Sequence, residues 1–242
     1  MSFFEIGLRE AWHLIVSGDP ALRSIVGVTL QVAGVSTGIA IVAGVPAGLA
    51  LGLGRFRGRR IGLAAANAGM GLPPVVVGLV LSLLLFPAAP LGHLRLLFTL
   101  EGVFVAQTIL AVPIVVALTA SSVQSIDAGL LDQARAFGAS RVAVAMLALR
   151  EARIGVLAGI IAAAGSALSE VGAVVLVGGN IEGLDQTLAS AALQKVEAGR
   201  FSEGLAIGIV LLALIAVVAG LLTVLQYADR RAGGRGIGRV RL

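Results

Sequence analysis

The chain has 242 residues, of which 58% are hydrophobic and only 13% are charged, with a net charge of +5. Soluble globular domains carry about 25% charged residues, so this composition excludes a water-soluble protein and indicates a polytopic membrane protein. The absence of cysteine excludes disulfides and thiolate metal sites, and the two histidines, His13 and His93, are too far apart in sequence for ligand spacing. We therefore expect no metal site.

The first 18 residues predict a short helix that lies in the membrane interface. Charged residues interrupt its apolar positions, and no small-residue cleavage site follows, which argues against a signal peptide. Asp19, which precedes Pro20, is expected to cap the next helix. The apolar residues recur at helical spacing and include a tryptophan expected at headgroup depth: Phe4, Leu8, Ala11, Trp12 and Ile15.

Five stretches with almost no charge predict five membrane spans, because about 20 apolar residues cross the hydrocarbon core. We place the spans at approximately 24–53, 61–87, 102–122, 154–177 and 205–227. The expected fold class is therefore all-α, a polytopic membrane protein with a single transmembrane domain over residues 1–242.

Pro73 and Pro74 interrupt the second predicted span. Proline breaks the helical hydrogen-bond ladder, and the freed backbone groups are tolerated in a membrane only where protein or a water-lined cavity satisfies them. A bend that borders a transport pathway and a simple kink are both compatible with this pattern. Asn67, just before the prolines, is the nearest polar side chain to the break.

The arginines predict the orientation of the chain. The segments after the first, third and fifth spans hold four, four and five basic residues, together 13 of the 18 in the chain. The positive-inside rule places these segments in the cytoplasm, with the N-terminus outside and the C-terminus inside. This placement explains the positive charge without nucleic acid. The glycine- and arginine-rich tail, residues 229–242, is expected to be disordered or bound to anionic headgroups.

Glycines at four-residue spacing predict close packing between helices. They are Gly34 and Gly38, Gly44, Gly48 and Gly52, Gly155 and Gly159, and Gly204 and Gly208.

The cytoplasmic segment 126–151 predicts a helical hairpin. Asp127 is expected to cap a first helix, Gly138 to make the turn, and Ser140 to cap a second helix. An ordinary loop is the alternative from the pattern alone. The run from Asp132 to Ser140 also resembles the EAA loop of ABC importer permeases, which fits a groove on the ATPase subunit. This sequence has Asp132 where Glu is usual and Gln133 where Ala is usual.

The EAA resemblance implies that a short set of residues couples the chain to an ATPase. They are Asp132, Gln133, Ala134, Arg135 and Gly138. Two further runs, 67–79 and 169–181, resemble the molybdate, sulfate and tungstate permeases. The runs Glu170-Val-Gly-Ala-Val and Val177-Gly-Gly-Asn-Ile are most similar to the tungstate branch, and the resemblance extends from Phe3 to about Gln226.

This resemblance implies the permease subunit of an ATP-driven oxyanion importer in the prokaryotic cytoplasmic membrane. Tungstate is the favoured cargo, and molybdate and sulfate are the alternatives within the same class. The implied partners are a second copy of the chain, two ABC ATPase subunits and an external binding protein. A passive anion channel or a membrane scaffold would need no shaped cytoplasmic hairpin, so the hairpin argues against both.

Glu170 is the one ionisable residue deep in a predicted span, and such residues are functional candidates by default. A negative charge would repel an anionic cargo, so we favour a structural role for Glu170. No arginine or lysine lies mid-span, so the anion is expected to pass along weakly binding hydroxyls and amides. The candidates are Ser36, Thr37, Gln107, Thr108, Ser166 and Ser169.

The chain is not expected to be an enzyme. A Walker A loop requires a glycine-rich run that ends in lysine, and the only lysine, Lys195, follows Leu193 and Gln194. No cofactor is therefore expected on this chain, and ATP would be hydrolysed by a separate subunit.

Overall fold

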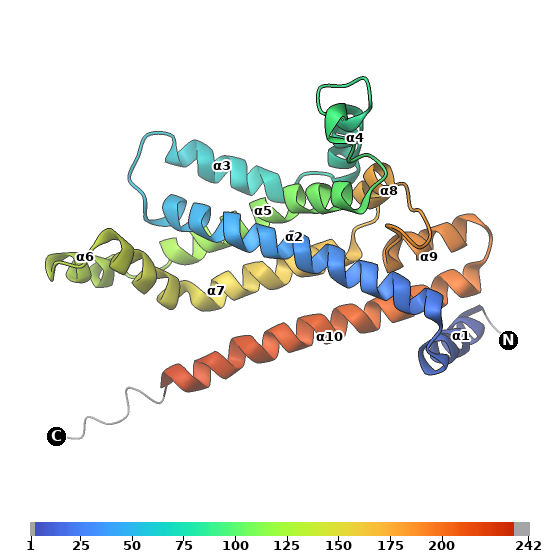
Figure 1. Cartoon of the computed structure of the whole chain (residues 1–242). Helices are drawn as coiled ribbons and strands as arrows, with labels where there is room; N and C mark the ends of the chain where they lie inside the picture. The colour runs from blue at the N-terminus through green and yellow to red at the C-terminus, as the bar shows by residue number, and fades with distance from the viewer. Residues whose placement is uncertain (1–2, 235–242) are drawn as a thin grey trace.

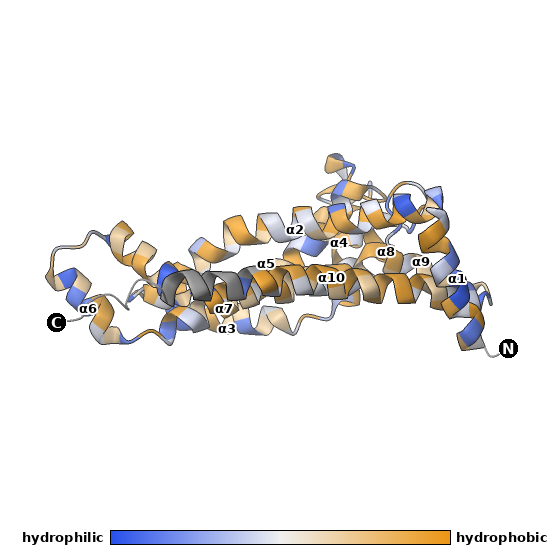
Figure 2. Cartoon of the chain, turned by 90° about the horizontal axis from the view of Figure 1, so that it is seen from below, coloured by the Kyte–Doolittle hydropathy of each residue, from blue (hydrophilic) through white to orange (hydrophobic). Residues whose placement is uncertain are grey.

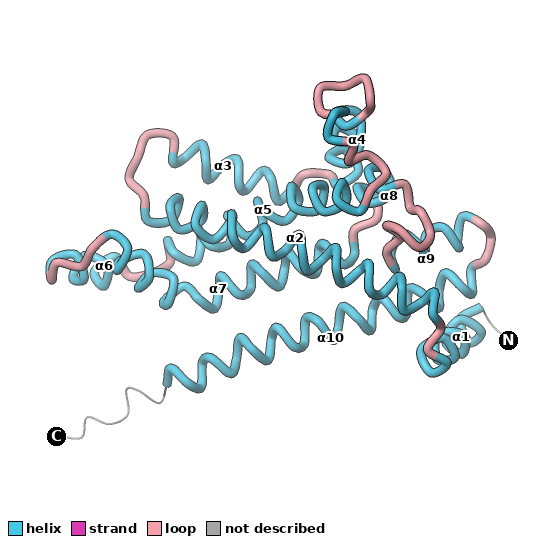
Figure 3. The backbone as a smooth tube through the Cα atoms, viewed as in Figure 1, coloured by secondary structure: helices cyan, strands magenta, loops and turns pink. Residues whose placement is uncertain are grey.

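The computed structural model describes residues 3–234, which form a bundle of helices without a strand in that range (Figures 1 and 3). In Figure 2, hydrophobic residues run along α10, and hydrophilic residues are visible on α1 and α6, near opposite ends of the bundle. The helices are α1 (Phe3–Ser17), α2 (Pro20–Leu53), α3 (Arg59–Met70), α4 (Pro74–Leu85), α5 (Leu100–Gln124), α6 (Ala128–Ala136), α7 (Arg141–Ser169), α8 (Gly172–Gly178), α9 (Leu188–Glu197) and α10 (Phe201–Gly234), with a 3₁₀ turn, η1 (Gly92–Leu94).

Three continuous helices, α2, α5 and α10, are long and apolar enough to cross a membrane. Two bent pairs meet the same test, α3 with α4 and α7 with α8, so the described chain has five spans when each pair counts as one. The pairs are bent by 102° and 59°. The predicted span 61–87 is therefore broken at Pro73 and Pro74, as the sequence predicts, whereas the break of the span 154–177 after Ser169 was not predicted.

The larger break is caused by the two prolines. Pro73 adopts the extended conformation, with ψ of 118°, because a residue before proline is disfavoured in the helical region. Pro74 then starts α4, where its missing N–H costs no intrahelical bond. As a result α4 runs across the bundle (Figure 1).

The centre of the bundle is a seam between α2 and α5, which run parallel. A Cβ added at Gly48 would lie 2.5 Å from Cβ of Thr119 and 2.8 Å from the carbonyl oxygen of Val116, so the two backbones approach closely there. The same register holds along the seam, at every fourth residue, in the pairs Val32 with Val103, Ala40 with Ala111, Gly44 with Val115, Gly48 with Thr119, and Gly52 with Val123.

The other glycine pairs give mixed outcomes. Gly155 and Gly159 face Ser122 and Leu118 of α5, so α7 packs antiparallel to α5, as close packing predicts. Gly204 packs on Val196 of α9. By contrast, Gly34, Gly38 and Gly208 have no described atom within 4 Å of an added Cβ, so the packing prediction was wrong for them within this chain.

The structure agrees with the sequence prediction at the N-terminal end of the chain and differs from it at the C-terminal end. Asp19 caps α2 as predicted, and its carboxylate accepts the Leu22 N–H at 2.9 Å. The amphipathic helix predicted at the N-terminus is α1, which lies against α10 with Ala11 buried and Trp12 70% exposed. At the other end α10 continues to Gly234, so residues 229–234 are helical and not disordered, and the alternative that they bind anionic headgroups stays a prediction. The rest of the predicted tail, residues 235–242, lies outside the described residues.

The segment between the last two spans contains a helix, α9, that was not predicted. Thr187 and Ser190 form a reciprocal capping box at its start. The hydroxyl of Thr29 on α2 accepts the Leu188 N–H at 2.9 Å and donates to the Ile25 carbonyl at 2.7 Å. The Leu188 bond fixes the start of α9 to the N-terminal part of α2.

The loop before α9 buries a carboxylate. Asp185 is fully buried, and its Oδ1 accepts the Ile181 N–H at 2.6 Å. Its Oδ2 has no hydrogen-bond partner in the described part of the chain, and Gly178 leaves the space that this oxygen occupies. Burial raises the pKa of Asp185 above 3.8, an effect that backbone hydrogen bonds from Ile181 and Asp185 oppose.

Two glycine substitutions on α2 test the close approach of the backbones at the seam. Gly48→Ala should lower the free energy of unfolding by about 1–3 kcal/mol, because the methyl group overlaps Thr119 and the Val116 carbonyl. Gly27→Ala, on an open face of the same α2, should not lower it and should raise it by up to about 1 kcal/mol, because alanine favours the helix. Equal thermal unfolding midpoints for the two variants in detergent would rule out the close seam.

Asp185 predicts a pH dependence of stability. Because its pKa is raised on folding, the native chain binds more protons than the unfolded chain. As the pH falls from neutral toward 3.8, the wild type should gain stability relative to Asp185→Asn, which cannot titrate. Unfolding of both proteins across this range measures the difference, and parallel pH profiles would contradict the buried carboxylate.

Candidate functional site

The hairpin predicted over 126–151 is present with the expected chemistry. The carboxylate of Asp127 accepts the Gly129 N–H at 2.8 Å and starts α6, and the hydroxyl of Ser140 accepts the Ala143 N–H at 3.2 Å and starts α7. Between the helices, Gly138 has a φ of 85°, which favours glycine. A helical hairpin, and not an ordinary loop, therefore connects α5 to α7.

The helix α6 is attached to the bundle by one buried residue, and most of its other residues are exposed. Leu131 is buried in a cluster with Val123, Val144 and Ala148 of α5 and α7. Asp132 and Gln133 are exposed, and Asp132 pairs with Arg135 at 2.6 Å. Exposed pairs of this kind contribute little to stability, so this polar face is available for contact with a partner.

The two broken spans meet each other at their breaks. A Cβ added at Gly172, at the start of α8, would lie 2.5 Å from Cγ2 of Val75 at the start of α4. One turn further on, a Cβ at Gly78 would lie 2.7 Å from Cα of Ala173. The helices α4 and α8 thus pack directly on each other, and we call this contact the α4–α8 junction.

Glu170 lies at the break between α7 and α8 and is half-buried. Its own backbone is extended, with ψ of 133°, and ends α7. Its carboxylate accepts the Ala173 N–H at 3.1 Å, which satisfies one of the free donors at the start of α8. Glu170 therefore holds the orientation of α8 at the junction.

The six polar residues predicted to line a pathway fall into two groups. Ser36, Thr37 and Gln107 are buried in or beside the α2–α5 seam, and the hydroxyl of Thr108 is buried as well. Their role in a transport pathway stays a prediction.

The second group is exposed. Ser166 and Ser169 lie on the free face of α7 directly before the break, and the Ser169 hydroxyl donates to the Gly165 carbonyl at 3.0 Å. Asn67 is exposed on α3 before the other break. The structure thus brings Ser166, Ser169 and Glu170 together, and through Val75 it places Pro73 and Pro74 next to them.

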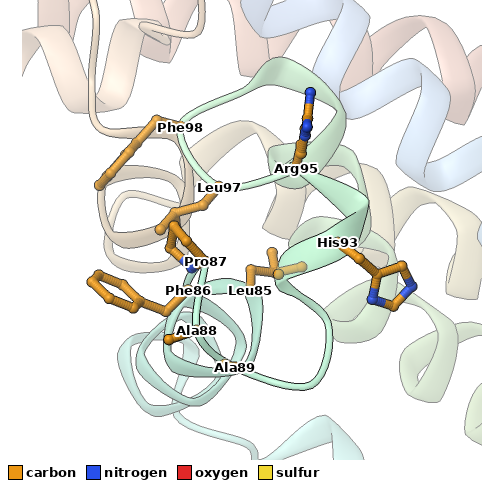
Figure 4. Close-up of a pocket in the computed structure, with 10 residues that line it drawn as sticks. Leu85, Phe86, Pro87, Ala88, Ala89, His93, Arg95, Leu97 and Phe98 are labelled. Carbon is orange, nitrogen blue, oxygen red and sulfur yellow. The ribbon is translucent and has the colours of Figure 1, made fainter.

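A loop to which the sequence assigned no role follows one broken span and contacts the other. Residues 86–99 lead from α4 to α5 and line a cavity of about 710 Å³, shown in Figure 4. In that view Phe86 and Phe98 lie on one side, whereas His93 points the other way. The Phe98 N–H donates to the Val177 carbonyl of α8 at 2.8 Å, and Phe98 has a φ of 60°. A positive φ at a phenylalanine has no signal in the sequence.

The Glu170 contact predicts different effects for two substitutions. Glu170→Ala should lower the free energy of unfolding by about 1 kcal/mol because α8 loses its cap. Glu170→Gln keeps an acceptor oxygen and should cost less than half of that. Thermal unfolding of the two variants measures this difference. Equal losses of unfolding free energy would mean that the charge of Glu170, and not its capping hydrogen bond, stabilises the fold.

Comparison with known proteins places the chain in a family. The family model described as "Binding-protein-dependent transport system inner membrane component" matches residues 44–231. A "Probable anion ABC transporter permease protein" of Haloferax volcanii is 40% identical, over 90% of this chain and 95% of the relative. The "Tungstate uptake system permease protein TupB" of Peptoclostridium acidaminophilum is 30% identical, over 93% and 99%.

Two further comparisons agree. The tungstate permease protein of Campylobacter jejuni is 32% identical over 90% of both chains. A solved chain from an inward-facing form of the MetNI methionine ABC transporter shares the fold, with a TM-score of 0.64 and 20% identity over 87% of this chain and 94% of that one. This chain, whose hairpin and broken spans are described above, belongs to the family of inner membrane components of binding-protein-dependent transport systems.

Proposed function

We propose that this permease subunit imports an oxyanion, with tungstate as the favoured cargo and molybdate or sulfate as alternatives. The observation that carries the proposal is the similarity over nearly the whole chain to a probable anion permease and to two tungstate permeases. The polar residues exposed at the α7 break, Ser166 and Ser169, are hydroxyls that suit weak contact with an anion. A conduit of this kind releases its cargo readily.

The geometry supports a mechanical route from an ATPase to the α4–α8 junction. One unbroken helix, α7, runs from the hairpin turn at Arg141 to the break at Ser169. A partner that binds the exposed face of α6 and displaces the hairpin would move α7 as a rigid rod. The other end of α7 carries Glu170 and thereby α8, so the displacement reaches the contact of α8 with α4.

The proposed assembly is a homodimer with one pathway between the two copies, two ABC ATPase subunits at the α6 ends, and a binding protein at the outer face. The bare faces at Gly34 and Gly38 support the dimer, because glycine there allows another helix backbone to approach closely. The chain itself binds no ATP in this proposal. The arginine distribution supports an outer N-terminus and a cytoplasmic C-terminus.

Uptake by reconstituted proteoliposomes tests the proposal. The vesicles hold the chain, its ATPase and its binding protein, and they receive tungstate with molybdate or sulfate as competitor. Gly138→Arg should reduce ATP-dependent uptake by at least about tenfold, because a bulky charged side chain disrupts the α6 contact surface. Gly58→Arg is the matched control, since both glycines have a positive φ and open space around an added Cβ.

Uptake that requires all three components and is lost only in Gly138→Arg would support an ATP-driven importer. Uptake without the ATPase would indicate a passive anion channel instead. A folded complex that takes up none of the three oxyanions would overturn the cargo assignment.

A further inference from the structure

A second cavity lies at the α6 end of the bundle, away from the α4–α8 junction. It has a volume of about 240 Å³ and lies between the end of α2, the α2–α3 connection, the end of α5 and α6. A water molecule occupies about 30 Å³ in the liquid, so the space accommodates a small polar ligand together with water. Three arginines line it, Arg55, Arg59 and Arg135.

Arg59 is held in place by the end of α2. Its Nε donates to the Leu51 carbonyl at 2.7 Å and its Nη2 to the Gly52 carbonyl at 3.3 Å. These bonds satisfy carbonyls that the helix end leaves free. A guanidinium has five N–H donors in a fixed fork, so Arg59 retains donors for a ligand after these two bonds.

The charges in the cavity do not cancel. Among the described residues that line it, Asp132 is the one carboxylate, and Arg135 pairs with it at 2.6 Å. Arg59 offsets the negative end of α2. Arg55 is exposed and makes no hydrogen bond or ion pair with another described residue, so its positive charge is uncompensated.

Guanidinium groups from separate segments of the cavity lining match one class of ligand. The planar fork of arginine fits the paired oxygens of phosphate and related tetrahedral anions better than other side chains do. Arg55 belongs to the α2–α3 connection and Arg135 to α6, so an anion held by both would join these two segments.

We propose that this cavity binds a tetrahedral oxyanion of the phosphate type, supplied either by the headgroup of an anionic lipid or as a free ion. The bound group bridges Arg55 and Arg135 and ties α6 to the end of α2. This inference goes beyond the proposed function, because it does not depend on which anion the chain transports.

The experiment uses the full chain in nanodiscs and separates the two sources. In one arm, inorganic phosphate, which is not the proposed cargo, is titrated calorimetrically onto the chain in phosphatidylcholine nanodiscs. In the other, native mass spectrometry measures how much phosphatidylglycerol the chain retains from mixed nanodiscs. Arg55→Gln and Arg135→Gln are compared with Arg57→Gln, which removes an exposed arginine of the same loop that does not line the cavity.

We expect Arg55→Gln and Arg135→Gln each to weaken binding in one arm by about tenfold or more, as for loss of a charge-assisted hydrogen bond. Arg57→Gln should change it by less than about twofold. A loss confined to the phosphate arm identifies a free ion, and a loss confined to the lipid arm identifies a headgroup. Equal losses in Arg55→Gln and Arg57→Gln, or no binding in either arm, would overturn the site.

Discussion

The close parallel packing of α2 against α5 is the constraint on which the rest of the structure depends. Lipid tails are as apolar as the helices, so packing contacts rather than the hydrophobic effect hold helices together in a membrane. Glycines on α2 let the two backbones approach, and α5 then serves as the support for the other spans. Leu118 and Ser122 of α5 pack against glycines of α7, and Pro113 of α5 packs against Gly69 of α3. Residues of α5 also form a cluster with α4 and α8.

The two broken spans contact each other beside α5, whereas α2, α5 and α10 are continuous helices. The α4–α8 junction joins residues far apart in sequence, Val75 with Gly172 and Gly78 with Ala173, and a carboxylate from Glu170 fixes the start of α8. The same helix that ends at the junction begins at the hairpin, so the proposed ATPase surface and the α4–α8 junction share one rigid element.

The features that local chemistry determines were predictable from the sequence. Caps at Asp19, Asp127 and Ser140 depend on a side chain and a backbone two or three residues away, and all three formed as predicted. The break at Pro73 and Pro74 was predictable as well. The 59° bend after α7, the helix α9 and the buried Asp185 depend on tertiary contacts that no short pattern contains. The helices are apolar on every face, so the sequence did not reveal that Ser36 and Gln107 point into the seam while Ser166 faces outward.

The most direct test of the central claim, that displacement of the hairpin moves α8 relative to α4 during transport, is a reversible cross-link across the α4–α8 junction. The chain has no cysteine, so Val75→Cys with Gly172→Cys introduces a single pair. An added Cβ at Gly172 lies 3.4 Å from Cα of Val75, close enough for a disulfide. We predict that the oxidised double variant loses ATP-driven uptake and regains it with reductant, so the reduced form of the same protein is the control for the two substitutions. Normal uptake by the fully cross-linked protein would contradict the claim.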